Sequence, residues 1–437
     1  MFFSKWQPLL TIKLICAFGS RDAGIAGTSD SQLLKLLLMF NGFYPGGEDA
    51  PDTPEGDLEA VQETTLYGYA LIQYERPYNL IGRYAELLDH LPAPGNRAGF
   101  NTWVDIRSVL AKDLGLPVDI FKAVLFALYA RSGIGASWPD DERPGPGLGS
   151  LNPETYFADT QVTRADLIRA LDLVTIYPNE IRDQHLAEYG NSLDNPVDLR
   201  VLPRKPAIKL SDGSLAGVSG QLLVQRCTYG LYWDIHDALP DDVSITPNRR
   251  TFQTFFGELH ERYGHNVLKR IADRQAKAKR KIRLMPEQDY AVSAGSNPDG
   301  LLLETIGNRN TRATLLEFKA GRPRYMDSIV ESDVQEFQAD LGRKIADGLD
   351  QEIRFCRQLL SGQRTIPDLQ VQDIRKWLFV IVVTDPFPSW EILPRPLRQR
   401  LADAADLEAS RTIGPLVLSL SELEQLETLP KNAYRNC

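Results

Sequence analysis

The chain lacks the features that mark a membrane protein or a disulfide-rich secreted protein. Its apolar runs, such as 33–40 and 124–130, fall short of the roughly 20 residues that a membrane-spanning helix needs. The N-terminus has no signal-peptide layout, because Lys13 interrupts its apolar stretch. The cysteines lie far apart and form no C-x-x-C pair: Cys16, Cys227, Cys356 and Cys437. We therefore expect a protein of the reducing cytoplasm that does not enter a membrane.

The sequence also lacks two common catalytic loops and a net positive charge. There is no Walker A sequence, and the glycine-rich segment 145–149 lacks the flanking strand and helix of a phosphate-binding loop. Segment 217–220 is not a nucleophile elbow. A net charge of −9 over 437 residues argues against a protein that coats DNA over its whole surface. A local basic patch can still bind DNA while the rest of the protein stays acidic.

The most informative segment is 297–322, in which two short apolar runs flank the polar turn 307–310 and predict a β-hairpin. Side chains alternate across a strand, so Glu317 and Lys319 share one face of the second strand. Phe318 then points to the opposite face, toward a core. Acidic residues and lysine are disfavoured in strands. A Glu-x-Lys ending on an apolar strand therefore calls for an explanation.

Metal chemistry supplies one explanation. Asp299 begins the first strand and can lie beside Glu317 once the hairpin closes. Hard cations such as Mg²⁺ prefer carboxylate, carbonyl and water oxygens, so Asp299, Glu317 and the backbone carbonyl of Phe318 form a candidate metal site. The metal would polarise a phosphodiester, while Lys319 would orient the attacking water or stabilise charge on the phosphate. The tripeptide alone also fits a surface hairpin with a solvated Glu/Lys pair.

These residues resemble the motif of the PD-(D/E)XK nucleases, the restriction-endonuclease-like superfamily. The matching residues are Pro298-Asp299 and Glu317-Phe318-Lys319. Over about residues 249–429, the resemblance implies an α/β fold with a mixed sheet flanked by helices. It also implies cleavage of phosphodiester bonds with Mg²⁺ or Mn²⁺, of DNA rather than RNA, with Asp299, Glu317 and Lys319 as catalytic residues.

The elements expected in this region follow that family's order of helix, three-stranded meander, helix and further strands. Apolar residues at three- and four-residue spacing predict the second helix, and continuous apolar runs predict the last strands. In chain order the predicted elements are a helix at 251–274, strands at 290–293, 300–306 and 313–319, a helix at 327–360, and strands at 377–383 and 415–420.

The resemblance further implies a glutamate that reaches the metal from the first helix. Glu258 and Glu261 are three residues apart and lie on roughly one helix face. Glu261, between His260 and Tyr263, is favoured by a small margin. His260 and His265 nearly match the H-E-x-x-H zinc signature, but histidines five apart differ by about 140° around a helix. We therefore do not expect a zinc site.

A basic stretch follows the first helix. If that helix continues, four cations form one stripe: Arg270, Arg274, Lys277 and Lys281. Such a stripe suits the phosphate backbone of double-stranded DNA, whose neutralisation releases counterions. A solvated helix face fits the same pattern. On the second long helix, Gln338 and Lys344 are further candidates for contacts near the metal or the phosphate.

The N-terminal part, 1–245, is predicted to be a mainly helical accessory or recognition region ahead of a nuclease domain at 246–437. A Pro/Gly-rich loop near 137–150 divides it into two candidate subdomains. Its clearest predicted elements are helices at 102–114, 118–130 and 163–175 and a hairpin around Asp212-Gly213. This region could recognise DNA, bind a protein partner, self-associate or restrain the nuclease.

The sequence thus predicts a metal-dependent nuclease, by analogy an effector of bacterial defence or of a mobile-element system. The alternative is a non-catalytic nucleic-acid-binding or assembly module that keeps the fold. Degenerate members of the family commonly lose one of the three motif residues. This chain retains Asp299, Glu317 and Lys319, which favours the enzyme.

Overall fold

The structure is a computed structural model that shows a mixed α/β protein with two mixed sheets. It describes residues 12–13, 15–17, 77–133, 150–190, 201–276, 281–290, 297–306, 310–320, 334–366, 369–384, 399–400, 402 and 412–428. These residues fall into two compact units, divided between Phe252 and Gln253, and residues 100–102 belong with the second unit. The division lies inside helix α13 (Arg249–Ala276), because Phe252 in its first turn packs on Tyr232, with ring centroids 5.1 Å apart.

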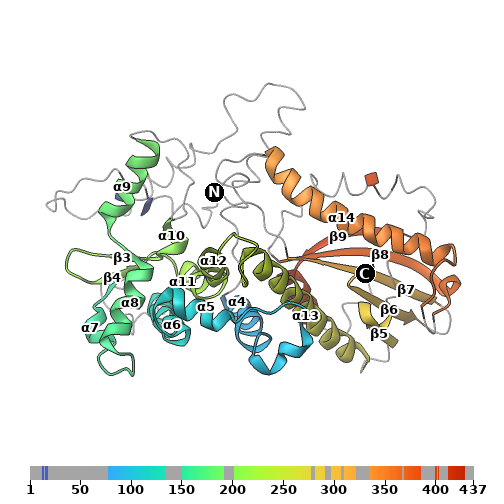
Figure 1. Cartoon of the computed structure of the whole chain (residues 1–437), viewed down its shortest axis with the longest axis horizontal. Helices are drawn as coiled ribbons and strands as arrows, with labels where there is room; N and C mark the ends of the chain where they lie inside the picture. Colours follow the sequence, from blue (N-terminus) through green and yellow to red (C-terminus); the bar gives the residue numbers. More distant parts are fainter. Residues whose placement is uncertain are drawn as a thin grey trace, which may run out of the picture. The chain divides into compact units, whose positions relative to one another are not determined.

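The N-terminal unit is built mostly of helices (Figure 1). They are α4 (Pro77–Ala85), α5 (Ile106–Leu114), α6 (Val118–Gly133), α7 (Pro153–Tyr156), α8 (Arg164–Val174), α9 (Pro178–Tyr189), α10 (Val201–Arg204), α11 (Gly220–Cys227) and α12 (Tyr229–Ala238). The helix predicted at 118–130 is confirmed as α6. The helix predicted at 102–114 begins only at Ile106, because the Asp105 carboxylate caps it by accepting the N–H of Ser108 at 3.0 Å.

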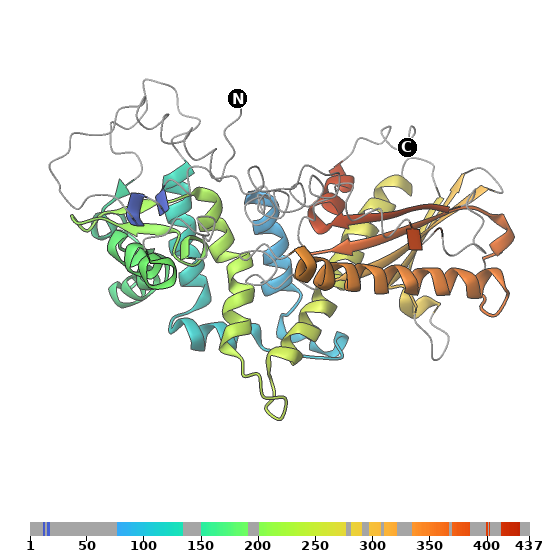
Figure 2. The same cartoon turned by 90° about the horizontal axis from the view of Figure 1, so that it is seen from above.

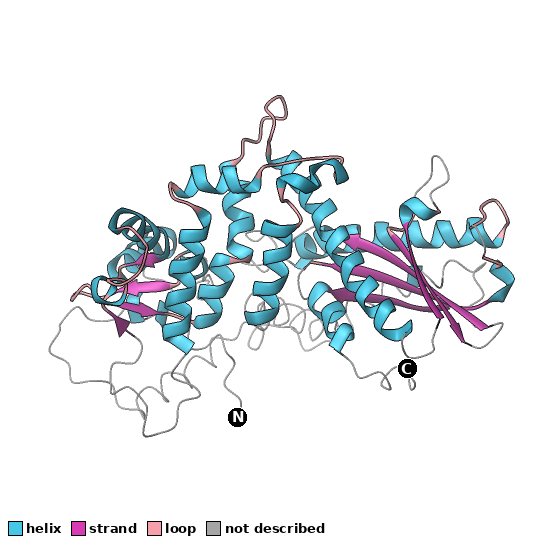
Figure 3. Cartoon of the chain, turned by 90° about the horizontal axis from the view of Figure 1, so that it is seen from below, coloured by secondary structure: helices cyan, strands magenta, loops and turns pink. Residues whose placement is uncertain are grey.

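A small sheet completes this unit, and its strands are magenta in Figure 3. Its strands are β1 (Ser150–Leu151), β2 (Thr175–Ile176), β3 (Ala207–Lys209) and β4 (Leu215–Gly217), in the order β1-β4-β3-β2. The predicted hairpin is confirmed, since β3 and β4 pair antiparallel across a turn in which Gly213 has a φ of 82°. Thr163 caps α8 as predicted, but Thr175 already belongs to β2. Of the predicted loop, 137–149 lie outside the described residues.

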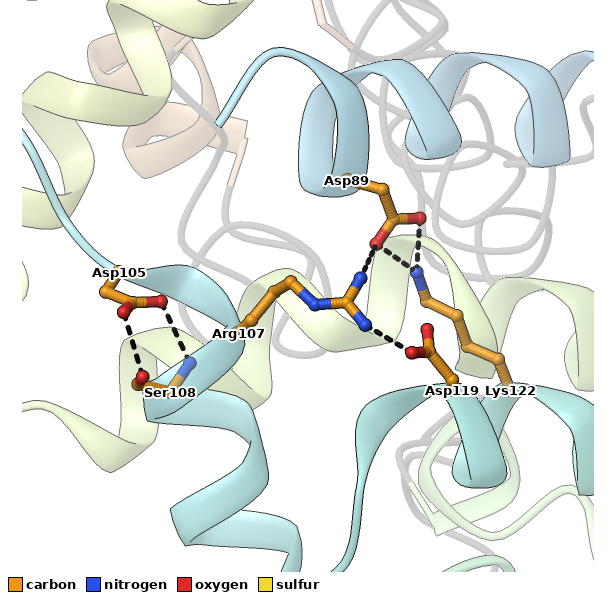
Figure 4. Close-up of polar contacts among 6 residues, drawn as sticks. All are labelled: Asp89, Asp105, Arg107, Ser108, Asp119 and Lys122. Atoms are coloured by element: carbon orange, nitrogen blue, oxygen red, sulfur yellow. Dashed lines mark hydrogen bonds and ion pairs between the residues drawn. The ribbon is translucent and has the colours of Figure 1, made fainter. Parts of the chain in front are cut away.

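An ion cluster joins three elements of the N-terminal unit (Figure 4). Asp89, in the π-helical turn η2 (Glu86–His90), accepts hydrogen bonds from Lys122 of α6 at 2.7 and 2.9 Å. Arg107 of α5 donates to Asp89 at 3.2 Å and also binds Asp119 of α6. Asp89 is thus the common acceptor for two cations from two helices.

The C-terminal unit contains a five-stranded sheet. Its strands are β5 (Lys281–Pro286), β6 (Gly300–Ile306), β7 (Asn310–Lys319), β8 (Ile374–Val383) and β9 (Thr412–Ser419), in that order across the sheet. The β5–β6 and β6–β7 pairs are antiparallel, while β7–β8 and β8–β9 are parallel. The long helix α14 (Val334–Leu360) makes the crossover between β7 and β8.

Most of the strands predicted here are confirmed. The strand predicted at 300–306 is β6, and those at 313–319 and 377–383 are the greater parts of β7 and β8. Of the strand predicted at 290–293, Tyr290 follows the short 3-10 turn η5 (Glu287–Asp289) as its C-cap, and 291–293 lie outside the described residues. The strand that pairs with β6 on this side is β5, at 281–286. The last predicted strand ends at Ser419, since Leu420 opens α16 (Leu420–Thr428).

Two glycines allow helices to approach the sheet closely from opposite faces. On α13, a Cβ at Gly264 would lie 2.0 Å from Cε1 of Phe318. On α14, a Cβ at Gly348 would lie 3.2 Å from both Cγ of Glu317 and Cε of Lys319. The alternation predicted for β7 therefore holds, and the two helices cover the two faces of the sheet (Figures 1 and 2). Within the described part of the chain, no helix combines the length and the apolar character needed to cross a membrane.

Candidate active site

Asp299, Glu317 and Lys319 meet at one end of the β6–β7 ladder. The last paired residues are Gly300 and Leu316, so Asp299 and Glu317 lie just beyond the pairing. Oδ2 of Asp299 accepts the backbone N–H of Phe318 at 2.6 Å, and Nζ of Lys319 donates to Oε1 of Glu317 at 2.6 Å. The N–H and C=O of a residue point to the same side of a strand, so the Phe318 carbonyl also faces the side of Asp299.

Backbone contacts fix the position of Asp299. Its carbonyl oxygen accepts hydrogen bonds from Nε2 of His265 at 3.0 Å and from the N–H of Glu287 at 3.1 Å. The preceding carbonyl, of Pro298, accepts the hydroxyl of Tyr290 at 2.5 Å. Donors from α13 and from the turn after β5 thus hold the main chain on both sides of the carboxylate.

Asn297 ties this segment to α14 and the turn that follows it. Its carbonyl accepts a hydrogen bond from the Gln351 side chain, and its side-chain oxygen accepts one from Arg364. Its side-chain amide donates to Glu287 at 2.8 Å. The Arg364 guanidinium also stacks on the ring of Phe355, 4.9 Å from its centroid. Three side chains therefore hold Asn297, two residues before Asp299.

The carboxyl groups of the site are shielded from water. Burial first, and then the nearby Asp299, raise the pKa of Glu317 to about 8, against the lowering effect of Lys319. Burial raises the pKa of Asp299 to about 6, against the lowering effects of the Phe318 N–H and Lys319. No described residue donates a hydrogen bond to Oε2 of Glu317. Such a site favours a proton or a cation between its carboxyl groups.

The structure distinguishes the two glutamates of the first helix. Glu261 is half-buried, and its pKa is raised to about 7, first by burial and then by Asp299 and Glu287. Glu258 instead accepts the backbone N–H groups of Asn101 at 2.9 Å and Thr102 at 3.2 Å. Glu261 is therefore within electrostatic reach of the carboxyl cluster, while Glu258 anchors a neighbouring segment.

The predicted basic stripe is not one helical surface. The helix predicted at 251–274 is confirmed as α13, which ends at Ala276, and Lys281 begins the edge strand β5. The condition for a single stripe, a helix that continues to Lys281, is therefore not met. Apolar residues alternate with Lys281 and Arg283, and this two-residue period specifies a strand. Arg270 binds Glu427 of α16 through two hydrogen bonds of 2.9 and 3.0 Å.

The other predicted residues are placed only in part. Arg274 donates to the Glu427 carbonyl, and so braces α16 as Arg270 does. Lys277 lies outside the described residues. Helix α14 is described over Gln338 and Lys344, but their side chains are not.

Glu352 was missed by the sequence analysis. It lies on α14, has no exposed surface, and its Oε1 accepts the N–H of Val380 at 3.4 Å. Burial first, and then Glu317, raises its pKa well above the usual range. The signal was available, because Glu352 interrupts the apolar stripe between Leu349 and Ile353.

The two histidines of α13 pack against an aromatic ring of β7. The rings of His260 and His265 are nearly perpendicular to that of Phe318, with centroids 5.8 and 5.3 Å away. Across the described residues, no group of three or more His, Cys, Asp and Glu side chains is arranged to hold a metal ion. Comparisons with protein-family models, curated proteins and solved structures found no match to this chain. The function has to be inferred from the geometry of the site.

Proposed function

We propose that the C-terminal unit is a metal-dependent nuclease of the PD-(D/E)XK type, with a restriction-endonuclease-like fold, that cleaves double-stranded DNA. The observation that carries the proposal is the convergence of Asp299, Glu317 and Lys319 at the end of one hairpin. The order of elements supports it, since helix α13, a three-stranded meander, α14 and two parallel strands follow one another in the chain.

The residues of the site fit a hard divalent cation. Asp299, Glu317, the Phe318 carbonyl and Glu261 offer only oxygen atoms, which Mg²⁺ and Mn²⁺ prefer. Oε2 of Glu317 has no partner among the described residues, and the pKa values of Asp299 and Glu261 are raised. Both features are expected of carboxyl groups arranged around a cation, when that cation is absent. When bound, the metal supplies Lewis acidity and lowers the pKa of a bound water.

The side chains of the site would position the substrate and stabilise charge. The clamp around Asn297 and the Phe318 N–H hold the Asp299 carboxylate in one orientation. Lys319 is held by Glu317, with its ammonium group at the same end of the sheet. There it can stabilise the negative charge that develops on a phosphate during hydrolysis. Positioning and electrostatic stabilisation are the main requirements for cleaving a phosphodiester.

A role in bacterial defence or in a mobile-element system is proposed by analogy alone. In that role the N-terminal unit would recognise DNA or a protein partner, or would self-associate, in the cytoplasm. The proposal does not require any particular arrangement of the two units.

Incubating the purified full-length protein with supercoiled plasmid, linear duplex DNA and single-stranded RNA tests this proposal. Each reaction is run with Mg²⁺, with Mn²⁺ and with EDTA. We expect plasmid and linear DNA to be cut in either metal and to survive in EDTA. A folded protein that binds DNA but cuts none of the substrates in either metal would instead be a non-catalytic binding module.

A further inference from the structure

Glu352 is buried in a way that its one hydrogen bond does not explain. The β8–β9 pairing shifts register between Leu378 and Val380, next to Gly414 of β9, which has a φ of 115°. The Val380 N–H donates to Oε1 of Glu352. That contact needs one acceptor oxygen, which the amide of a glutamine would supply without burying an ionisable group. No described residue donates a hydrogen bond to the second oxygen, Oε2.

Gly348 brings Glu352 and Glu317 together. Side chains on a helix lean toward its N-terminus, so the Glu352 side chain extends over the turn that contains Gly348. Gly348 has no side chain to fill that space, and Glu317 and Lys319 occupy the sheet directly beneath it. Among the charged groups around Glu352, Glu317 has the largest effect on the pKa of Glu352 and raises it.

Each of these two glutamates therefore has one satisfied and one unsatisfied oxygen. Oε1 of Glu317 accepts from Lys319, and Oε1 of Glu352 accepts from Val380. Both Oε2 atoms are buried, on side chains whose residues are 2% and 0% exposed, and neither has a partner among the described residues. Buried carboxylate oxygens without a donor favour a bound cation or a proton.

We propose that Glu317 and Glu352 together hold a divalent cation beneath Gly348, so that α14 supplies a metal ligand from the face of the sheet opposite α13. The proposal rests on the metal chemistry of the proposed function, and adds a ligand that the PD-(D/E)XK motif does not contain. Mg²⁺ is commonly held by one or two carboxylates with water filling its other positions, so two glutamates suffice. Their two negative charges balance a divalent ion.

A calorimetric titration of the protein with MnCl₂, in the absence of nucleic acid, tests this site. Replacing Glu352 by Gln keeps an acceptor for Val380 and removes the charge. We expect Glu352→Gln to weaken Mn²⁺ binding by roughly 10- to 100-fold, as lost metal-site interactions do. The matched control is Asp347→Asn, which removes an exposed carboxylate from the same helix and should change affinity by about twofold or less.

A second variant tests the site independently if Glu352→Gln does not fold. Gly348→Ala places a methyl group 3.2 Å from both Glu317 and Lys319, and so should also weaken Mn²⁺ binding. The control is Gly257→Ala on α13, where no atom lies within 4 Å of the added Cβ. Each variant is first melted without metal, to compare its folding with that of the wild type.

The outcomes separate this site from the nuclease proposal. Wild-type Mn²⁺ affinity in folded Glu352→Gln would show that Glu352 shares a proton with Glu317 or only caps β8, and would overturn the site. A wild type that binds no Mn²⁺ would overturn it as well. A protein that loses Mn²⁺ binding in Glu352→Gln but never cuts DNA would keep the cation site and overturn the nuclease.

Discussion

At the residue scale, the candidate site consists of carboxyl groups held where water cannot solvate them well. Glu317 is almost fully buried, yet only one of its oxygens has a donor among the described residues. Asp299 receives a backbone N–H, and Glu261 lies within its electrostatic reach. Burying carboxyl groups in this way lowers stability unless a ligand compensates. The site therefore lowers the free energy of unfolding most when no metal is bound.

A pH dependence of stability follows from these groups. The pKa of Glu317 is about 8 in the folded protein, against an ordinary value of 4.5. Between these values the folded state keeps a proton that the unfolded chain has released. Stability is therefore highest at the acidic end of this window and falls as pH rises, by up to about 1.4 kcal/mol per pH unit for each such proton.

Melting the metal-free protein in EDTA across this pH range measures the effect. We expect the melting temperature to fall as pH rises, and to fall less steeply in Glu317→Gln. Glu304→Gln, at the opposite end of β6, should keep the wild-type slope, because Glu304 pairs with Arg312 far along the hairpin. Equal slopes in Glu317→Gln and the wild type would contradict the buried-carboxyl account.

The ion cluster of the N-terminal unit gives a second prediction at this scale. Asp89→Asn removes the charge that Lys122 and Arg107 share, and the Lys122 side chain is only 13% exposed. We expect a loss of about 1 to 3 kcal/mol in the free energy of unfolding, measured by denaturant titration. Asp105→Asn makes the same change of charge on α5 but keeps a helix cap, so it should cost less than about 0.5 kcal/mol. Similar losses in both variants would mean that charge alone, and not this cluster, is responsible.

At the scale of elements, the sequence predicted secondary structure well where the apolar residues recurred with a single period. The β6–β7 hairpin was predictable because a polar turn separates two apolar runs, and α14 because its apolar residues recur at helical spacing. Strand β5 was not predictable, because Lys281 and Arg283 extend a basic run that began on α13. This run hides the alternation of apolar and polar residues along the strand. The position of Glu352 in the apolar stripe of α14 was visible in the sequence, but its neighbours Val380 and Glu317 lie on other elements, so its contacts could not be predicted from local sequence.

Gly264 supplies the element-scale prediction. A methyl group at this position would lie 2.0 Å from the Phe318 ring, so Gly264→Ala must push α13 away from β7. We expect a loss of about 1 to 3 kcal/mol in the free energy of unfolding, or more. Gly257→Ala on the same helix meets no atom within 4 Å, and should instead gain about 0.4 to 1 kcal/mol. Denaturant unfolding of both variants decides, and a tolerated Gly264→Ala would contradict the close contact of α13 with the sheet.

At the scale of the whole molecule, the net charge of −9 means that DNA binding must rely on local basic surfaces. Arg270 and Arg274 are bound to Glu427 and brace α16, whereas Lys281 is exposed on the edge strand. The four predicted DNA contacts are therefore not equivalent. Two stabilise the fold, and the other two remain candidates for phosphate binding.

Salt dependence of DNA binding separates the two pairs. Each neutralised phosphate contributes about 0.9 to the slope of log affinity against log salt on duplex DNA. Lys277→Gln with Lys281→Gln should flatten the slope by up to about 1.8. Arg270→Gln with Arg274→Gln should lower the melting temperature and leave the slope nearly unchanged. Equal slopes for wild type and the lysine double variant would move the DNA contacts elsewhere, most simply to the N-terminal unit.

The most direct test of the central claim is the rate of plasmid cleavage in Mg²⁺ by two site variants and one control. Asp299→Asn and Lys319→Met change side chains that meet at the end of the hairpin, whereas Glu304→Gln changes a carboxylate on the same sheet away from it. We predict that both site variants lose at least about 100-fold in rate, as removal of one transition-state contact does, while Glu304→Gln cuts like the wild type. A folded Asp299→Asn or Lys319→Met that cuts at the wild-type rate would contradict the assignment of this site.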